Sequence, residues 1–320
     1  MINLFECVEN VQDGLLRSGY IADRKTATTV FLAARLEKPL LVEGPAGVGK
    51  TFLAGALAVA TGSRLIRLQC YPGLDEGKAL YEWNYQKQLL YLQTLKENSN
   101  WDEIRAGVYT SEFLLPRPVL KAFLSTGPVV LLVDEADKSD DELESFLLEA
   151  LSEFQVSIPE LGTVRAKNRP LVIITSNNSR DFSDALKRRC LHLFINFPDA
   201  RREEIIIRMH VKEISEYLAG QVSLFLSRVR RMVLRKQPGI AETIDWARSL
   251  MALNIEGLDP EAVSMTINAL VKYEEDVAAL ESRLEELIPP GTGSSDNGPD
   301  LSDRSPLLSV DSDRLSRFNF

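Results

Sequence analysis

A glycine-rich segment between an apolar run and a helical pattern constrains the fold of this chain most strongly. It fits the pattern G-x-x-x-x-G-K-T, in which glycines let successive backbone N–H groups turn inward around phosphate oxygens. Phe52 to Ala60 then has the pattern of a helix that Gly62 ends, so the positive end of that helix faces the same phosphates. The segment predicts a strand, a nucleotide-binding loop and a helix in succession, and the loop comprises Gly44, Pro45, Ala46, Gly47, Val48, Gly49, Lys50 and Thr51.

Two residues of this loop carry the chemistry. The Lys50 ammonium can reach the β- and γ-phosphates, and the Thr51 hydroxyl can bind Mg²⁺. The predicted ligand is therefore a nucleoside triphosphate such as ATP with Mg²⁺. Phosphate loops contact phosphates and not the base, so ATP and GTP both remain open.

An unbroken apolar run, Val129 to Val133, precedes the adjacent acids Asp134 and Glu135. Such a run predicts a strand that is buried on both faces, as in a parallel sheet. Ligands of open α/β sheets bind beyond the carboxyl ends of the strands, which places both acids beside the phosphate loop. We expect Asp134 to hold Mg²⁺, directly or through water, and Glu135 to polarise the water that attacks the γ-phosphate. The alternative is a pair of acids that simply face solvent.

A second buried strand pattern, Leu171 to Ser176, ends at the same predicted sheet edge. Asn177 follows it and is placed to orient the attacking water or to touch the γ-phosphate. Other patterns complete an α/β domain. They are strands over Arg64–Cys70 and Leu191–Phe197, a helix over Thr26–Leu36, a partly helical stretch over Trp101–Phe123 interrupted by Pro116 and Pro118, and a helix capped by Ser139 with Leu143, Phe146, Leu147, Ala150 and Leu151 on one face.

Two segments depart from regular α/β spacing and predict hairpins. In Tyr71–Gln93, the aromatic residues Tyr81, Trp83 and Tyr85 alternate at period two, which favours an inserted β-hairpin with an aromatic face. This face either packs on the domain or contacts a partner or substrate. Phe154–Ala166, with turn residues at its centre, predicts a second hairpin.

After Pro198 the sequence shows only helical periodicity, in segments near 199–213, 214–235, 240–254 and 260–287. We therefore expect an α/β domain over residues 1–198 and a smaller all-helical lid domain over 199–288. Residues 289–320 are rich in Pro, Gly, Ser and Asp and bury too little apolar surface to offset ordering entropy, which predicts a disordered tail.

Charge and composition narrow the functional class. The formal net charge is −9, which argues against a constitutive nucleic-acid binder. One basic run predicts a solvated helical face, and the alternative is a site for phosphate or an acidic partner; it comprises Arg228, Arg230, Arg231, Arg235 and Lys236.

Membrane-spanning runs, signal peptides and metal-binding motifs each have a recognisable sequence pattern. No apolar run approaches the roughly 20 residues that span a bilayer, and the acidic N-terminus does not resemble a signal peptide. The expected location is the cytoplasm. Cys7, Cys70 and Cys190 have no disulfide or zinc-site spacing, and neither His192 nor His210 is expected to bind a metal.

The order of these motifs, followed by a helical domain, resembles the AAA+ ATPases from about Ile21 to Leu287. The phosphate loop, the early insertion and Ile174–Asn178 look like the MoxR branch. Within it, Ala185–Cys190 and Ile240–Ala247 resemble the CoxD-type members.

This resemblance implies a P-loop NTPase core of the AAA+ type, with a parallel sheet between helices, followed by the helical lid. Gly44 to Thr51 would be Walker A, Asp134 and Glu135 Walker B, and Asn177 sensor 1. Arg189, with Arg188 beside it, would be the arginine finger that reaches the γ-phosphate of a neighbouring subunit, and the sequence leaves open which of the two acts. The active form would then be a ring, most simply a hexamer.

Two family positions depart from the usual pattern. A sensor 2 arginine is expected at the start of the third lid helix, but Pro238–Glu242 lacks one and Arg248 lies two turns later. The glutamate-switch position, at the end of the second strand, falls at Gln69 or Cys70.

The resemblance further implies a Mg²⁺-dependent ATPase that works as a chaperone of the MoxR kind. Its partners would be a von Willebrand factor A-domain protein and a client metalloenzyme, a molybdenum hydroxylase of the carbon monoxide dehydrogenase type. Two alternatives are a nucleic-acid-associated AAA+ motor and a nucleotide-gated scaffold that does not hydrolyse ATP. The presence of Glu135 argues against the scaffold, which needs no general base.

Overall fold

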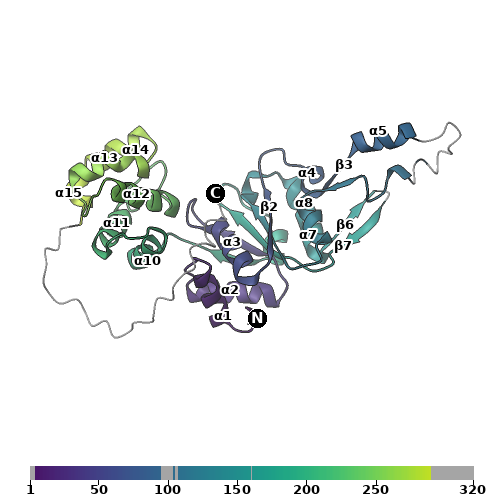
Figure 1. The fold of residues 1–320 in the computed structure, drawn as a ribbon, viewed down its shortest axis with the longest axis horizontal. Coiled ribbons are helices and arrows are strands. Elements are labelled where there is room, and N and C mark those ends of the chain that lie inside the picture. The colour runs from purple at the N-terminus through teal and green to yellow at the C-terminus, as the bar shows by residue number, and fades with distance from the viewer. Residues whose placement is uncertain (1–3, 95–103, 105–106, 160, 290–320) are drawn as a thin grey trace. The chain divides into compact units, whose positions relative to one another are not determined.

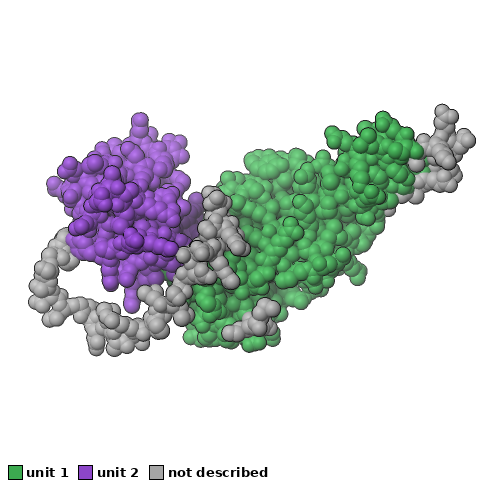
Figure 2. Space-filling view, viewed as in Figure 1, with its two compact units in different colours: residues 1–44, 50–195 green, residues 45–49, 196–320 purple. Residues whose placement is uncertain are grey.

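The computed structural model describes residues 4–94, 104, 107–159 and 161–289. Contacts divide the chain into two compact units, residues 1–44 with 50–195, and residues 45–49 with 196–320 (Figure 2). Our domain ranges 1–198, 199–288 and 289–320 stay predictions, and the predicted tail lies outside the described residues from 290 onward.

A five-stranded parallel sheet forms the centre of the first unit (Figure 1). Its strand order is β2-β5-β8-β1-β9. Every residue of β1 and β5 is buried, which confirms the unbroken apolar runs as strands of a covered parallel sheet. The strands are β1 (Leu40–Glu43), β2 (Arg64–Gln69), β5 (Val129–Asp134), β8 (Leu171–Ser176) and β9 (Leu191–Phe194), so the last is shorter than predicted.

Helices cover the sheet, and the predicted α/β fold is confirmed. The phosphate loop leads into α3 (Lys50–Thr61), which packs against β2, β5 and β8. The apolar residues of α7 (Pro118–Leu124) and α8 (Asp141–Glu153) share a core with alternate strand residues such as Leu131 and Val133. The predicted apolar face of α8 is buried throughout.

Some helix boundaries differ from the prediction. The cap of α8 is Asp140, whose side chain accepts from the backbone N–H of Leu143, while Ser139 ends the 3₁₀ turn η1 (Ala136–Lys138). The predicted helix near Thr26 is α2 (Arg24–Arg35). Two further helices of this unit are α1 (Val8–Arg17) and α9 (Asp184–Arg189).

The first predicted hairpin is wrong. Asn84 caps a helix, because its side chain accepts from the backbone N–H of Lys87, and α5 (Tyr85–Thr94) therefore replaces the second predicted strand. The strand β3 (Tyr81–Trp83), preceded by α4 (Glu76–Leu80), pairs instead with the distant β4 (Leu114–Pro116).

The alternating aromatic residues separate accordingly. Tyr81 and Trp83 pack against the core of the first unit, with ring centroids 5.9 Å apart, whereas Tyr85 is exposed on α5. Of the stretch Trp101–Phe123, residues 101–103 and 105–106 lie outside the described residues. Its prolines do not interrupt a helix, because Pro116 ends β4 and Pro118 begins α7 at a position where no backbone N–H is needed.

The second predicted hairpin is confirmed. It consists of β6 (Gln155–Ile158) and β7 (Gly162–Arg165), which pair antiparallel. Phe154, with φ of +51°, ends α8 and turns the chain into β6.

The described part of the second unit, residues 45–49 and 196–289, contains helices and no strand. Trp246 is fully buried at the centre of its core. The predicted helix over 260–287 is wrong in one respect, because the chain is extended at Val271 and Tyr273 and the segment splits into three helices. The helices are α10 (Ala200–His210), α11 (Glu216–Val229), α12 (Ile240–Ala252), α13 (Pro260–Leu270), α14 (Glu274–Glu281) and α15 (Leu284–Leu287).

Candidate functional site

The loop after β1 has a backbone that suits an anion. Gly44, Gly47 and Gly49 have φ values of +150°, +78° and +91°, a region that residues with a Cβ rarely adopt. A Cβ at Gly44 would lie 2.0 Å from the backbone oxygen of Ile195. The glycines of the motif are therefore required by the loop conformation, and this conformation directs backbone N–H groups toward one concavity in phosphate loops.

Lys50 is the first residue of α3 and is buried, with 6% of its surface exposed. Its Nζ donates to the backbone oxygen of Gly44 at 2.7 Å and to Oδ1 of Asn177 at 2.8 Å. The Nδ2 of Asn177 donates in turn to Oε1 of Glu135 at 3.3 Å. Asn177, at the end of β8, thus links the lysine of the loop to the acid at the end of β5.

Thr51 and Asp134 form the second half of the cluster. The Thr51 hydroxyl donates to Oδ1 of Asp134 at 2.9 Å, and the Thr175 hydroxyl donates to the same oxygen at 2.6 Å. A hydroxyl and a carboxylate are hard oxygen ligands of the kind that Mg²⁺ selects, usually together with waters and substrate phosphates. The donor set therefore fits Mg²⁺, which Thr51 and Asp134 would hold.

Glu135 has an unusual backbone and several partners. Its φ and ψ of 54° and 46° are left-handed, which is uncommon for a residue with a side chain and is a conformation that clusters at functional sites. The Thr175 hydroxyl accepts from its backbone N–H at 2.9 Å. Its Oε2 accepts from Gln69 Nε2 at 2.9 Å and from Lys138 Nζ at 2.7 Å. The Glu135 carboxylate is thus held in a defined orientation by side chains that donate to it.

Burial and nearby acids set the charge of Lys50. Burial lowers the pKa of Lys50 to about 8, although the negative charges of Asp137, Asp134 and Glu135 act in the opposite direction. Asp137 is itself buried, which raises its pKa, but hydrogen bonds from the Ser179 hydroxyl and backbone outweigh burial and leave the pKa of Asp137 lowered. The lowered pKa of Asp137 keeps a negative charge near Lys50.

The two candidate finger arginines lie elsewhere. Arg188 and Arg189 are exposed at the end of α9, and Arg189 Nη1 donates to the backbone oxygen of Ala185 in its own helix at 3.4 Å. No hydrogen bond joins either arginine to Lys50, Asp134 or Glu135 within the described residues. The structure thus brings together the loop, both acids and Asn177, and leaves this arginine pair on the surface.

The structure distinguishes Gln69 from Cys70, the two candidates for the glutamate-switch position. Gln69 is exposed at the end of β2 and contacts Glu135, whereas Cys70 is buried and its pKa is raised to about 12 by burial. The sequence already predicts this difference in burial. Side chains alternate along a strand, so Cys70 shares the inward face of Ile66 and Leu68. The sequence analysis does not single out Arg67, Lys138 or Thr175, because Arg67 and Thr175 lie within strands and Lys138 lies beyond the paired acids, where no motif marks them.

The start of the third lid helix has no arginine in the described structure. Gly239 is the N-cap of α12, and within the second unit the N–H of Ile240 donates to the backbone oxygen of Gly47 at 2.8 Å. Arg248 contacts Asp245 and the backbone oxygen of His210 instead.

The basic run is largely a structural element of the second unit. Arg230 is buried and forms a bidentate pair with Glu203, so the prediction of a solvated face is wrong for this residue. Arg228 donates to the last carbonyl oxygens of α15, Arg235 stacks on the Tyr273 ring, and Lys236 pairs with Glu242. Arg231, the fifth member of the run, is exposed, as the prediction of a solvated face expects.

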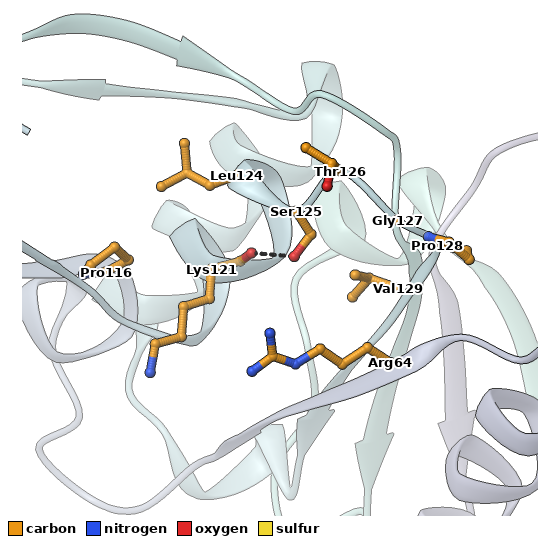
Figure 3. A pocket seen from close by; sticks show the side chains of 9 residues that line it. All are labelled: Arg64, Pro116, Lys121, Leu124, Ser125, Thr126, Gly127, Pro128 and Val129. Atoms are coloured by element: carbon orange, nitrogen blue, oxygen red, sulfur yellow. Dashed lines mark hydrogen bonds between the residues drawn. The ribbon is translucent and has the colours of Figure 1, made fainter.

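A surface hollow of about 420 Å³ lies at the other edge of the sheet (Figure 3). Arg64 begins β2 and Val129 begins β5, and both line this hollow, whereas Asp134 and Glu135 follow the carboxyl end of β5. The hollow is therefore separate from the cluster around Lys50. In the described part of the chain, no helix has the length and apolar character that crossing a membrane requires.

Comparison with known proteins agrees with this geometry. Residues 39–190, which contain β1, the loop, both acids and Asn177, match the family model for the AAA domain of the dynein-related subfamily. A protein of Staphylococcus haemolyticus strain JCSC1435, described as uncharacterized protein SH1500, is 23% identical over 281 residues, which cover 85% of this chain and 99% of that protein.

Solved structures with a similar fold include RuvB of Thermotoga maritima. One, titled as a Holliday junction branch migration motor, is 16% identical, covers 89% of this chain and 79% of its own, and superposes with a TM-score of 0.44. A RuvB mutant is also 16% identical, covers 82% of this chain and 75% of its own, and gives 0.46. This likeness concerns the fold alone.

Proposed function

We propose that the protein works as a MoxR-type chaperone. The premise is that residues 39–190 are an AAA domain of the dynein-related subfamily and that the protein is an ATPase. The subfamily includes the MoxR-like ATPases, and the sequence resembles that branch in its loop and in the strand before Asn177. The proposed activity is Mg²⁺-dependent hydrolysis of ATP, which drives the remodelling of a client protein.

One observation carries the catalytic part of this proposal: Lys50, Asn177 and Glu135 form a continuous hydrogen-bonded chain. In our proposal Lys50 binds the terminal phosphates, and Asn177 orients the attacking water or contacts the γ-phosphate. Glu135 accepts the proton of that water. Thr51 and Asp134 hold Mg²⁺, which when bound neutralises developing charge on the phosphates.

The proposed assembly is a ring, with a hexamer as the expected size. Arg188 and Arg189 are exposed, and within the described residues neither forms a hydrogen bond with Lys50, Asp134 or Glu135, which supports a role toward a neighbouring subunit. We assign Arg189 as the finger that completes the site of the neighbouring subunit, with Arg188 beside it. An arginine supplied in trans typically accelerates hydrolysis by about 10³ to 10⁵.

The proposed partners are a von Willebrand factor A-domain protein and a client metalloenzyme of the molybdenum hydroxylase or carbon monoxide dehydrogenase type. The resemblance to CoxD-type members supports this choice. If it is right, a host that carries only the Glu135→Gln variant will accumulate client protein with an incomplete metal centre. Equal metal content in the client from hosts with and without the protein would contradict the client assignment.

The nucleic-acid motor has no specific support in the structure. Four of the five residues of the basic run that suggested it have side-chain partners inside the second unit. A location in the cytoplasm remains part of the proposal.

The substitution Glu135→Gln tests the proposed chemistry. It removes the proton acceptor but keeps an oxygen for Asn177, so ATP binding is expected to persist while hydrolysis falls by at least about a hundredfold. Hydrolysis is measured by phosphate release and binding with a fluorescent ATP analogue. Glu149→Gln is the matched control, because Glu149 is an exposed acid on α8. Hydrolysis by Glu135→Gln at the rate of this control would contradict the role of Glu135.

A further inference from the structure

Arg67 lies on β2 and connects both acids of the site. Its Nη2 donates to Oδ2 of Asp134 at 2.5 Å and to Oε1 of Gln69 at 2.6 Å. Gln69 then donates to Glu135 at 2.9 Å. A single guanidinium therefore contacts the expected metal ligand directly and the expected general base through one amide.

Asp134 needs a positive partner. Its side chain is 2% exposed, and a carboxylate this deeply buried is costly unless it is paired and hydrogen-bonded. Thr51 and Thr175 both donate to Oδ1, so Oδ2 is the oxygen left for a cation. The Arg67 guanidinium occupies it, while its own side chain is 45% exposed and can move into solvent.

The Arg67 contact also determines how Gln69 is oriented. Arginine has only N–H donors, so the oxygen of the Gln69 amide must face it. The amide nitrogen of Gln69 then faces Glu135 and donates to its carboxylate. If Arg67 moves away from the site, nothing else on β2 in the described structure fixes this orientation.

We propose that Arg67 is a positioning residue that occupies the place of a divalent cation at Asp134 in the nucleotide-free protein and leaves Asp134 when Mg²⁺ and nucleotide bind. Its departure releases the Gln69 amide and with it one restraint on Glu135. The proposal rests on the roles assigned above to Asp134 and Glu135. In this proposal, the exchange of Arg67 for Mg²⁺ at Asp134 removes a restraint on Glu135.

The substitution Arg67→Gln tests the exchange by a binding measurement. A fluorescent ADP analogue is titrated with the full-length protein while free Mg²⁺ is varied from chelated to millimolar. Without the competing positive charge, we expect the half-saturating Mg²⁺ concentration to fall by about tenfold. Arg67→Lys keeps the charge, so its midpoint should stay closer to that of the unaltered protein.

Arg64→Gln is the matched control, because Arg64 is an exposed arginine on the same strand outside the cluster. Its Mg²⁺ midpoint should not change. A midpoint that is unchanged or raised in Arg67→Gln, in a variant that unfolds at the temperature of the control, would overturn the proposal. A purely structural role of Arg67 would lower that temperature and leave the midpoint where it was.

A second measurement uses the unaltered protein and does not depend on the folding of a variant. An arginine-specific dicarbonyl reagent is applied with ADP and Mg²⁺, or with ADP and a chelator, and modified arginines are mapped by mass spectrometry. We expect Arg67 to react several-fold faster with Mg²⁺, while Arg64 reacts equally in both. Equal or slower reaction of Arg67 with Mg²⁺ would overturn the exchange.

These results separate the inference from the proposed function. If the unaltered protein binds ADP without any dependence on Mg²⁺, then the roles of Thr51 and Asp134 fail, and the exchange fails with them. If binding depends on Mg²⁺ but neither the Arg67→Gln midpoint nor the reactivity of Arg67 changes, then only the exchange fails.

Discussion

Asn177 shows how a single residue can organise this site. Its oxygen must face Lys50, which only donates, and its nitrogen therefore faces Glu135. Asn177 thereby links Lys50, the proposed phosphate-binding group, to Glu135, the proposed general base. Preorganised donors of this kind lower the reorganisation that the reaction requires.

The lowered pKa of Lys50 predicts a pH dependence of nucleotide binding. Free protein holds Lys50 largely neutral above pH 8, and bound phosphate raises the pKa of the ammonium again, so binding takes up a proton. Affinity for ATP is therefore highest below pH 8 and should fall by up to about tenfold per pH unit above it. Calorimetry in buffers of different ionisation enthalpy measures the proton uptake.

Lys50→Arg is the control for this pH effect. Arginine stays charged throughout this range, so whatever affinity the variant retains should not vary between pH 7 and 9.5. Equal ATP affinity of the unaltered protein at pH 7 and pH 9.5, without proton uptake, would contradict the burial effect on Lys50.

At the scale of elements, the buried strands and the loop were predictable because each has a local signature. Five consecutive apolar residues before Asp134 specify a covered strand without knowledge of its neighbours. Gly44 and Gly47 indicate the loop conformation because residues without a Cβ readily adopt positive φ values. The positions of Asp134, Glu135 and Asn177 then follow from the rule that parallel strands end at one edge.

Other elements depended on contacts that the sequence does not display. The alternation of Tyr81 and Trp83 correctly indicated a strand, but its partner β4 lies about 30 residues away and not in the next segment. The helix α5 begins because Asn84 caps it, a signal that the aromatic pattern concealed. Arg67 and Thr175 became part of the site only through pairing across strands.

We expect the buried pair Glu203–Arg230 to stabilise the second unit. Glu203 on α10 is fully buried and accepts from Arg230, which ends α11, and from Thr243 on α12. Glu203→Gln leaves the arginine charge unpaired, so the free energy of unfolding should fall by about 3–5 kcal/mol. Denaturant unfolding followed by the fluorescence of Trp246, which is buried in this unit, measures the change.

Asp245→Asn provides the comparison, because the pair Asp245–Arg248 is exposed. Exposed pairs contribute about 0–1 kcal/mol, so this variant should unfold almost as the unaltered protein does. Equal stability of Glu203→Gln and Asp245→Asn would contradict the role of the buried pair.

At the scale of the whole molecule, we propose that the site is completed between subunits, and the exposed position of Arg189 outside the cluster supports this. Lys50→Ala should abolish ATP binding, and Arg189→Ala should leave binding intact while it suppresses hydrolysis. A mixture of the two should recover part of the activity, because Arg189 of the first variant meets the intact loop of the second. Phosphate release from the mixture, compared with each variant alone, measures this recovery.

A second mixture is the control for the recovery. Lys50→Ala and Glu135→Gln both damage the loop side of the site, so their mixture has no complete interface and should stay inactive. Substantial hydrolysis by Arg189→Ala alone would remove the role of this arginine in trans.

The central claim is an ATPase whose sites are completed between subunits, and the most direct measurement is hydrolysis per subunit across a wide range of protein concentration. Mg²⁺ is present and no partner is added, and sedimentation of the same samples gives the state of assembly. The account predicts a specific activity that rises steeply as subunits assemble and then saturates. The same specific activity in samples that sediment as monomers and as rings would contradict it.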